Sequence, residues 1–327
     1  MSPSVIDVAR LCDVSPSTVC RALNGKADIN KETKRRILAA CAELGYTKNR
    51  GASNLRIGRS TTIACLFSDH ANELFIEKLH FLKTEVVAAG YTPRIYSYRE
   101  QDEAARFLAE IVSSRPAGLI ADLHPDAEMK RLIRANRLAV VCYDRDVPGM
   151  DCVVLDRRAG SREAVRHLIE QGRTRIALLG AHVDSERGMG YAEALQEARI
   201  PIAAELVLDA PFARDLFRYG CEQIGAAWPA LRFDALYTVN DASAIGAIRA
   251  LSELGARVPE DVAVVGFDDI MVGAVTVPSL STVRQPKEEM ALASVRFLAN
   301  RLADYEHPRQ SVRLETRLVV RESSRVK

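Results

Sequence analysis

Residues 5–25 read VIDVARLCDVSPSTVCRALNG, and this stretch decides the fold of the N-terminal region. Two short segments with apolar periodicity meet at Asp13-Val14. Ser15 is suited to cap the second segment, and Pro16 suits its first helical position, where no backbone N–H is needed. The spacing of the apolar residues predicts two helices that bury a shared seam formed by Val8, Ala9, Val14, Val19 and Leu23.

The second of these helices would carry Ser17, Thr18 and Arg21 on its outer side. Such an arrangement is typical of a helix-turn-helix, in which the start of the second helix reaches base edges in the major groove of DNA. Arginine suits a bidentate contact with guanine, while serine and threonine suit phosphates or bases. An ordinary helical hairpin also gives loose matches to this pattern. The coincidence of cap, proline, turn and exposed arginine favours DNA binding.

The same residues resemble the headpiece of the lactose-repressor (LacI/GalR) family of bacterial transcription regulators, which reads much like DVARLAGVS..TVSRVLN. In this chain Asp13 stands where the family usually has glycine, and Cys20 stands where a serine often contacts phosphate. Aspartate tolerates a left-handed turn less well than glycine does. Together with the pattern, the resemblance implies DNA contacts from Ser15, Pro16, Ser17, Thr18, Arg21, Asn24, Thr33, Tyr46, Asn49, Ala52, Ser53 and Leu55.

A third helix is predicted to begin after Asn30 and to end at Gly45, which gives a headpiece of residues 1–46. Residues 47–60 are polar and basic, and on composition alone they form a linker. The resemblance implies that they form a hinge helix, whose leucine wedges between base steps in the minor groove. The family pattern of this hinge is matched at Tyr46, Asn49, Ala52 and Leu55.

The distribution of charge separates the N-terminal region from the rest of the chain. Residues 1–60 contain eleven Lys and Arg against five Asp and Glu, whereas the remaining residues contain 34 against 38. A basic segment on a mildly acidic body is the electrostatic footprint of a nucleic-acid-binding protein. A merely solvated basic face would explain these counts only if the helix-turn-helix pattern were set aside.

Several classes of protein are disfavoured by composition. The seven cysteines are scattered without a CxxC pair, which favours reduced thiols over a disulfide framework. The six histidines show no metal-ligand spacing, so we expect neither a metal nor a cofactor. The start of the chain lacks the apolar region of a signal peptide, and no apolar run approaches the roughly eighteen residues of a membrane span. These features predict a cytoplasmic protein.

From Thr61 onward, short apolar or β-branched runs alternate with amphipathic helical stretches. Such alternation with short connections predicts an α/β fold with doubly wound parallel sheets, and the length leaves room for two lobes. The runs expected to form strands are 62–67, 94–98, 118–121, 139–143, 175–179, 235–239 and 262–266.

The resemblance to the family extends over this body, through residues 157–172, 264–269 and 281–286. It implies a two-lobed, periplasmic-binding-protein-like body over residues 61–327 that binds an effector and dimerises. Lobe 1 is expected to comprise approximately 61–155 and 285–311, and lobe 2 approximately 156–284 and 312–327.

Polar residues follow several predicted strands, at the position where open α/β sheets bind ligands. Asp144, Asn240 and Asp268 follow strands, Arg187 opens a stretch that resembles the family's R..GY, and Gln285 lies at a crossover. Such carboxylates, amides and guanidinium groups suit a polyol or another compact polar ligand. The alternative is that strand-end aspartates are helix caps.

The resemblance adds first-lobe residues Ser68 and Phe75 to the expected site, although Phe75 could equally belong to the core. Phe212 would stack on a ligand ring, within a stretch (209–219) that contains an insertion relative to the family. The effector-binding residues are thus predicted to be Ser68, Phe75, Asp144, Arg187, Phe212, Asn240, Asp268 and Gln285.

We therefore interpret the chain as a DNA-binding transcriptional regulator, most simply a repressor, that binds a pseudo-palindromic operator as a homodimer. Its effector is expected to be a sugar or sugar derivative, with a nucleobase, a nucleoside or a protein co-regulator as the alternative. A sugar-binding protein without a regulatory role is disfavoured by the headpiece. An enzyme is disfavoured as well, because the sequence contains no P-loop, and Gly188-Met189-Gly190 lacks the third glycine of a dinucleotide site.

Overall fold

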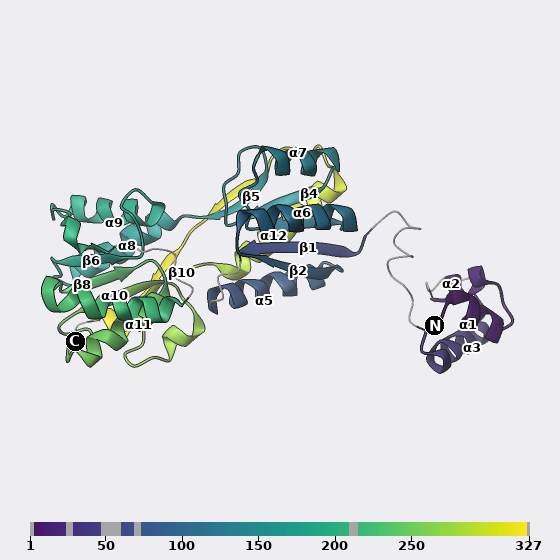
Figure 1. Ribbon diagram of the computed structural model, residues 1–327, viewed down its shortest axis with the longest axis horizontal. Helices are drawn as coiled ribbons and strands as arrows, with labels where there is room; N and C mark the ends of the chain where they lie inside the picture. Colours follow the sequence, from purple (N-terminus) through teal and green to yellow (C-terminus); the bar gives the residue numbers. More distant parts are fainter. Residues whose placement is uncertain (1–2, 24–28, 47–59, 69–72, 209–214, 326–327) are drawn as a thin grey trace. The chain divides into compact units, whose positions relative to one another are not determined.

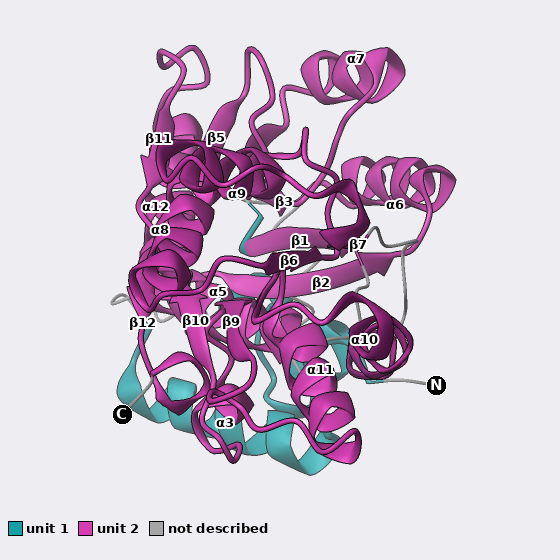
Figure 2. Ribbon diagram, turned by 90° about the vertical axis from the view of Figure 1, so that its left-hand side faces the viewer, with its two compact units in different colours: residues 1–61 teal, residues 62–327 magenta. Residues whose placement is uncertain are grey.

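The computed structural model describes residues 3–23, 29–46, 60–68, 73–208 and 215–325. The chain divides into two compact units, residues 1–61 and residues 62–327 (Figure 2). The first unit is helical, and the second contains two parallel-sheet lobes, so the predicted fold class is confirmed. Within the described residues no helix combines the length and apolarity that crossing a membrane requires.

The first unit consists of three helices, α1 (Val5–Leu11), α2 (Pro16–Leu23) and α3 (Lys31–Leu44). The predicted cap of α2 is confirmed, because the Thr18 backbone N–H donates to Ser15 Oγ at 3.1 Å. The helix α3 is capped by Asn30 and ends at Gly45 with a φ of 63°. Asp13 adopts a φ of 49° in the turn between α1 and α2, so aspartate takes the left-handed conformation here.

One small apolar core holds the three helices together. Each helix contributes fully buried side chains, and the predicted seam is extended by α3 through Ile37 and Cys41. The Arg36 guanidinium ties α3 to the end of α1 by donating to the Cys12 carbonyl oxygen at 2.7 Å.

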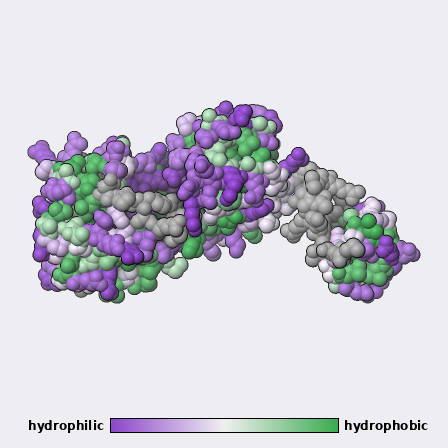
Figure 3. Space-filling view, viewed as in Figure 1, coloured by the Kyte–Doolittle hydropathy of each residue, from purple (hydrophilic) through white to green (hydrophobic). Residues whose placement is uncertain are grey.

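The first lobe is built on a six-stranded parallel sheet in the order β11-β5-β4-β3-β1-β2 (Figure 1). Its strands are β1 (Thr62–Ser68), β2 (Thr92–Tyr98), β3 (Gly118–Ala121), β4 (Ala139–Tyr143), β5 (Asp151–Leu155) and β11 (Ser311–Leu314). Helices α5 (Glu73–Ala88) and α12 (Lys287–Ala303) cover one face, and α6 (Gln101–Ser114) and α7 (Ala127–Ala135) cover the other. The outer side of α6 is mostly hydrophilic, as an amphipathic covering helix requires (Figure 3).

The second lobe has the sheet order β12-β10-β9-β8-β6-β7, in which only β12 is antiparallel to its neighbour. Its strands are β6 (Ile176–Leu179), β7 (Val207–Leu208), β8 (Ala235–Thr238), β9 (Ala263–Asp268), β10 (Ser281–Arg284) and β12 (Arg317–Val319). Helices α8 (Arg157–Glu170) and α9 (Glu186–Glu197) pack on one face, and α10 (Leu216–Leu231) and α11 (Asp241–Glu253) pack on the other. Short 3-10 helices lie at η1 (Ala204–Leu206), η2 (Met271–Ala274) and η3 (Glu322–Ser324).

The chain passes between the lobes three times: after β5, after β10 and after β11. The sequence predicts the third passage near Ser311, with lobe 2 resuming at residue 312. In the structure this passage lies later in the chain. Residues 311–314 form β11, which pairs with β5 in the first sheet. Val312 and Leu314 face the first-lobe core and hold this strand there, so the passage falls after Leu314.

Candidate functional site

The start of α2 carries residues that were predicted to contact DNA. Ser15, Pro16, Ser17 and Arg21 are exposed, and Ser17 and Arg21 lie one helical turn apart on the same side. Thr18 is half-buried, and its Oγ1 lies 2.9 Å from Ser15 Oγ. The exposed side of α2 thus presents a hydroxyl and a guanidinium group.

Thr33 and Tyr46 are both half-buried. Thr33 lies in the first turn of α3, and Tyr46 packs against the headpiece core, where its backbone N–H donates to the Cys41 carbonyl oxygen at 2.8 Å. Burial raises the pKa of the Tyr46 hydroxyl, so it stays protonated and able to donate a hydrogen bond. Five further predicted contacts lie outside the described residues, namely Asn24, Asn49, Ala52, Ser53 and Leu55.

A cavity of about 120 Å³ lies at the carboxyl ends of β1, β3 and β4 in the first lobe. Five of the predicted effector residues line it: Ser68, Phe75, Asp144, Arg187 and Gln285. The other lining residues are Phe67, Leu74, Lys78, Asp122, Tyr143 and Arg145. The second lobe supplies Arg187 and the crossover after β10 supplies Gln285, so side chains from both lobes meet at one space.

Asp144 lies at the end of β4 with a φ of 63° and accepts hydrogen bonds from two cations. Lys78 Nζ lies 2.7 Å from Oδ2, and Arg157 Nη2 is bonded to Oδ1. Burial acts to raise the pKa of Asp144, but Lys78 and Arg157 outweigh it and hold the pKa at about 2. The carboxylate is therefore ionised at neutral pH.

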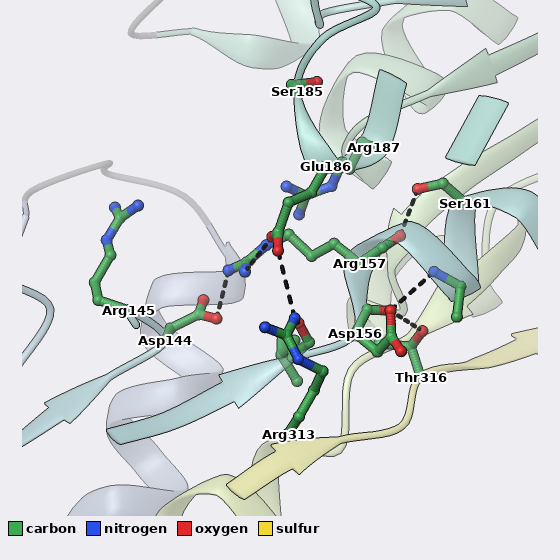
Figure 4. Close-up of polar contacts among 12 residues, drawn as sticks. Asp144, Arg145, Asp156, Arg157, Ser161, Ser185, Glu186, Arg187, Arg313 and Thr316 are labelled. Atoms are coloured by element: carbon green, nitrogen blue, oxygen red, sulfur yellow. Dashed lines mark hydrogen bonds and ion pairs between the residues drawn. The ribbon is translucent and has the colours of Figure 1, made fainter. Parts of the chain in front are cut away.

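Arg157 carries this ion pair into the second lobe, as Figure 4 shows. Its Nη1 lies 3.4 Å from Glu186 Oε2, and the other oxygen of Glu186 lies 3.4 Å from Arg313 Nη1 on β11. The chain of ion pairs therefore passes from the first lobe to the second and back again. A separate link joins the lobes where the Met271 backbone N–H donates to Glu77 Oε1 at 2.8 Å.

Asp268 is the last residue of β9 and is 4% exposed. Gln285 Nε2 donates to its Oδ1 at 2.5 Å, whereas Arg187 Nη2 lies 3.9 Å from the same oxygen. Burial raises the pKa of Asp268 to about 6, although Arg187 and Lys78 act in the opposite direction. Unlike Asp144, this carboxyl group has a neutral amide as its nearest partner.

Arg187 packs on the Phe267 ring in addition to its contact with Asp268. Its guanidinium carbon lies 4.3 Å from the centre of the Phe267 ring, and burial lowers the pKa of the group. Its Nε is buried without a hydrogen-bond partner among the described residues, and the same holds for Gln285 Oε1 and the Tyr143 hydroxyl. Three residues that line the cavity therefore retain capacity to bind a ligand.

Asn240 has a capping role in the structure. Its side chain accepts a hydrogen bond from the Ser243 backbone N–H at 2.8 Å and so caps α11. It is not part of the cavity lining among the described residues. The helix-cap alternative therefore applies to Asn240, whereas Asp144 and Asp268 accept from other side chains. Phe212 lies outside the described residues.

Ser68 and Phe75 line the first-lobe wall in different ways. Ser68 Oγ donates to Asp122 Oδ2 at 3.0 Å, and Arg145 Nε lies 2.5 Å from the other oxygen of Asp122. The Phe75 ring meets Phe67 edge-on at 6.1 Å and also packs against the first-lobe core. The Phe75 side chain therefore both packs against the core and lines the cavity.

Sequence reasoning missed several charged residues at this site. Asp122 directly follows the predicted strand 118–121, so the rule that identified Asp144 would also have identified Asp122. Arg145 is the next residue after Asp144, and Arg157 opens α8. Lys78 gives no signal in the sequence, because only the packing of α5 brings it to Asp144. The described residues contain no group of three His, Cys, Asp or Glu side chains able to hold a metal ion.

Comparison with known proteins gives two matches to family descriptions. Residues 4–49 match the bacterial regulatory proteins of the lacI family, and residues 165–324 match a periplasmic binding protein-like domain. The HTH-type transcriptional regulator GntR of Pseudomonas aeruginosa is 31% identical over 334 residues, covering 98% of this chain and 96% of its own. The HTH-type transcriptional repressor PurR of Aliivibrio fischeri is 28% identical over 331 residues, 98% of each chain.

Solved structures agree with this relationship. A lac repressor dimer bound to operator and the anti-inducer ONPF matches with a TM-score of 0.85 at 25% identity, covering 99% of each chain. The complex of the transcriptional regulator CelR with cellobiose matches with a TM-score of 0.72 at 28% identity, covering 98% of this chain and 100% of its own. The chain belongs to the lacI family and is a DNA-binding transcriptional regulator, not an enzyme.

Proposed function

We propose that this regulator is a homodimeric repressor that binds a pseudo-palindromic operator and responds to a small polar effector, a sugar or sugar derivative. The observation that carries the proposal is the polar cavity to which both lobes contribute, with Asp144 on one side and Arg187 and Gln285 on the other. A ligand that contacts both lobes shifts the equilibrium between lobe arrangements by its differential affinity for them. Such a shift is the means by which a small molecule can control DNA binding at a separate site.

The operator part of the proposal is supported by the headpiece. Ser17 and Arg21 are exposed on one side of α2, and the first 60 residues carry an excess of basic side chains. Two recognition helices related by a dimer axis read two half-sites, which accounts for a pseudo-palindromic operator. The solved lac repressor that resembles this chain was captured as a dimer on its operator.

The effector part is supported by the chemistry of the cavity lining. The unpartnered Gln285 oxygen can accept from a ligand hydroxyl, and the Tyr143 hydroxyl can donate or accept. The similar CelR structure holds cellobiose. The cavity lining thus contains both hydrogen-bond donors and acceptors. A ligand rich in hydroxyl groups, which both donate and accept, suits this lining better than an apolar ligand would.

Selection of binding sites from random duplex DNA by the full chain tests the proposal. We expect an enriched sequence with two-fold symmetry, bound by two chains per duplex. Arg21→Ala should relax specificity at one symmetric position in each half-site, with a loss of about 1–3 kcal/mol of discrimination there. The matched control is Arg218→Ala, which removes an exposed arginine of α10 in the second lobe. Enrichment of unsymmetrical sites, or equal weakening on all sequences with Arg21→Ala, would contradict the assignment.

The proposed class of effector is tested by adding small molecules to the regulator–operator complex. Sugars, sugar derivatives, nucleobases and nucleosides are screened by thermal shift, because a ligand stabilises the state that it binds. A sugar-class compound that stabilises the protein and changes operator affinity supports the proposal. A nucleoside that does so in its place would correct the class of effector while keeping the regulatory role.

A further inference from the structure

Three sulfur atoms lie together on one face of the first-lobe sheet. Cys142 on β4 and Cys152 on β5 are directly paired in the register of the sheet, and both are buried. Because neighbouring strands lie about 4.8 Å apart, these two side chains lie in contact. The Met150 Sδ lies 4.0 Å from the Cys142 Sγ. The three residues form a small core cluster of their own with Val147 and Val154.

The surroundings of Cys152 favour its thiolate form. A hydrogen bond from the Cys142 thiol lowers the pKa of Cys152, although burial acts in the opposite direction. The Val147 backbone N–H donates to Cys152 Sγ at 3.2 Å, and Arg309 Nη2 lies 3.8 Å from the same sulfur. In contrast, burial raises the pKa of the Cys65 thiol on β1 to about 12. The thiolate is the form in which cysteine binds a metal ion, so Cys152 is prepared for this role.

A second cavity, of about 370 Å³, connects the sulfur cluster to solvent. Lys130, Met150 and Arg309 are among the residues that line it. Met150 therefore contacts both the cavity and the buried Cys142 thiol. The Arg309 side chain is 41% exposed, and the Nη2 that approaches Cys152 is also bonded to Asp146 Oδ1 at 2.8 Å. An ion that enters this cavity reaches the thioether first and the two thiols behind it.

We propose that Cys142, Met150 and Cys152 bind a soft monovalent metal ion, copper(I), in a three-coordinate site. Thiolates and thioethers are the ligands that select Cu(I), whereas Zn²⁺ prefers four ligands in a tetrahedron. Three sulfurs at about 2.3 Å from a central ion lie about 4 Å apart, as Cys142 Sγ and Met150 Sδ do. Binding releases the thiol protons to solvent, and Arg309 lies beside the negative charge that the two thiolates leave on the complex. No local sequence motif signals this site, because the register of the sheet brings the two cysteines together.

A competition titration tests the site on the full chain. Copper(I) is supplied in the absence of oxygen as its coloured complex with the chelator bicinchoninate, and the protein is added in steps. The loss of colour measures the copper that is transferred to the protein. Cys142→Ser and Cys152→Ser should each remove a single tightly bound ion per chain. Met150→Leu, which keeps the apolar volume, should weaken binding of this ion without removing both thiolates.

Further variants separate the proposed site from the other cysteines. Arg309→Gln keeps all three sulfurs but removes the guanidinium beside Cys152, and it should weaken copper binding about 10–100-fold. The controls are Cys65→Ala, which removes a buried thiol of the same lobe, and Cys221→Ser, which alters a half-buried thiol of the second lobe. Both controls should bind copper as the wild type does. The unfolding temperature without copper verifies that each variant folds.

X-ray absorption at the copper edge identifies the ligands. We expect three sulfurs at about 2.3 Å in the wild type and two in Met150→Leu. Nitrogen or oxygen ligands, or copper binding that is unchanged in Cys142→Ser and Cys152→Ser, would overturn the inference. Absence of copper transfer to the wild type would overturn it as well. None of these results affects the proposed effector or operator, because the three sulfur-bearing residues are not among the described residues that line the effector cavity.

Discussion

A strand-terminal aspartate lies on each side of the cavity, yet the two carboxyl groups have opposite surroundings. Asp144 lines the first-lobe wall, whereas Asp268 contacts the second-lobe wall through its hydrogen bond with Gln285. Asp144 on the first-lobe wall accepts from Lys78 and Arg157, and its pKa is about 2. Asp268, which is not itself among the described residues that line the cavity, accepts from the amide of Gln285, and its pKa is about 6. The position of a carboxylate at a strand end therefore does not determine its role.

The difference assigns distinct tasks to the two walls. Asp144 is committed to an ion pair that joins the lobes through Arg157. Asp268 is buried with Arg187 as its nearest cation, 3.9 Å away, and with Gln285 as its hydrogen-bond donor. Arg187 and Gln285 each have a buried polar atom without a partner among the described residues. We infer that Asp144 sets how the lobes meet, and that the polar groups around Asp268 help to recognise the effector.

The largest effect should come from neutralising Asp144. Asp144→Asn keeps a residue that tolerates the left-handed backbone but removes the carboxylate that Lys78 and Arg157 share, leaving Arg157 only its longer contact with Glu186. Because both cations are largely shielded from water, the loss should reach about 3–5 kcal/mol of unfolding free energy. The matched variant Asp268→Asn should cost less than about 1 kcal/mol, because the amide oxygen can still accept from Gln285 and the nearest cation, Arg187, lies 3.9 Å away. Denaturant unfolding of both variants measures the difference, and equal losses would remove the distinction between the walls.

The pH dependence of stability should also separate the two aspartates. The pKa of Asp268 is raised from 3.8 to about 6, so the folded state takes up a proton more readily than the unfolded state. Its contribution to stability therefore grows as the pH falls, by about 1 kcal/mol between pH 7 and pH 5. The pKa of Asp144 is lowered to about 2, so its stabilisation is complete above about pH 4 and is lost only below that.

Unfolding measurements at pH 7, 6 and 5 on the wild type and both variants isolate these contributions. The difference between wild type and Asp268→Asn should change over this range, and the difference between wild type and Asp144→Asn should stay constant. The opposite behaviour would exchange the roles of the two carboxyl groups.

A smaller effect is expected where the ion-pair chain reaches solvent. Glu186 and Arg313 have side chains that are 48% and 47% exposed, so water screens their contact. Glu186→Gln should therefore cost about 0.2–1 kcal/mol of unfolding free energy, less at high salt. If Glu186→Gln lost as much unfolding free energy as Asp144→Asn, the whole chain of ion pairs, and not only its buried part, would hold the two lobes together.

Much of the fold could be predicted because local signals were strong. The cap at Ser15, the helix end at Gly45 and the runs at 118–121 and 139–143 match the structure closely. Five strands were not among the predicted runs, namely β5, β7, β10, β11 and β12. The strands β7, β11 and β12 are short and only partly buried, so they lack the continuous apolar run that identified the others. Their pairing depends on tertiary packing, which is why the third passage between the lobes was placed too early.

A site residue could be predicted only where its position follows directly from the end of a strand. Asp144 follows β4 and lines the cavity, whereas Asp268 ends β9 and bonds to the lining residue Gln285. The same rule selected Asn240, whose side chain caps α11 in the structure and is not among the described residues that line the cavity. The ion pair with Lys78 required the packing of α5 against the sheet, and no spacing in the sequence encodes that contact.

If ligand binding in the cavity controls operator binding, an operator titration will show it. Operator affinity is measured with and without the compound identified by thermal shift, on the wild type and on Asp268→Ala. We expect the compound to change the operator affinity of the wild type by roughly 5–150-fold, equivalent to a coupling of 1–3 kcal/mol, whereas Asp268→Ala should lose this response and keep its ligand-free affinity. A variant that still responds fully would show that the ligand acts from another site.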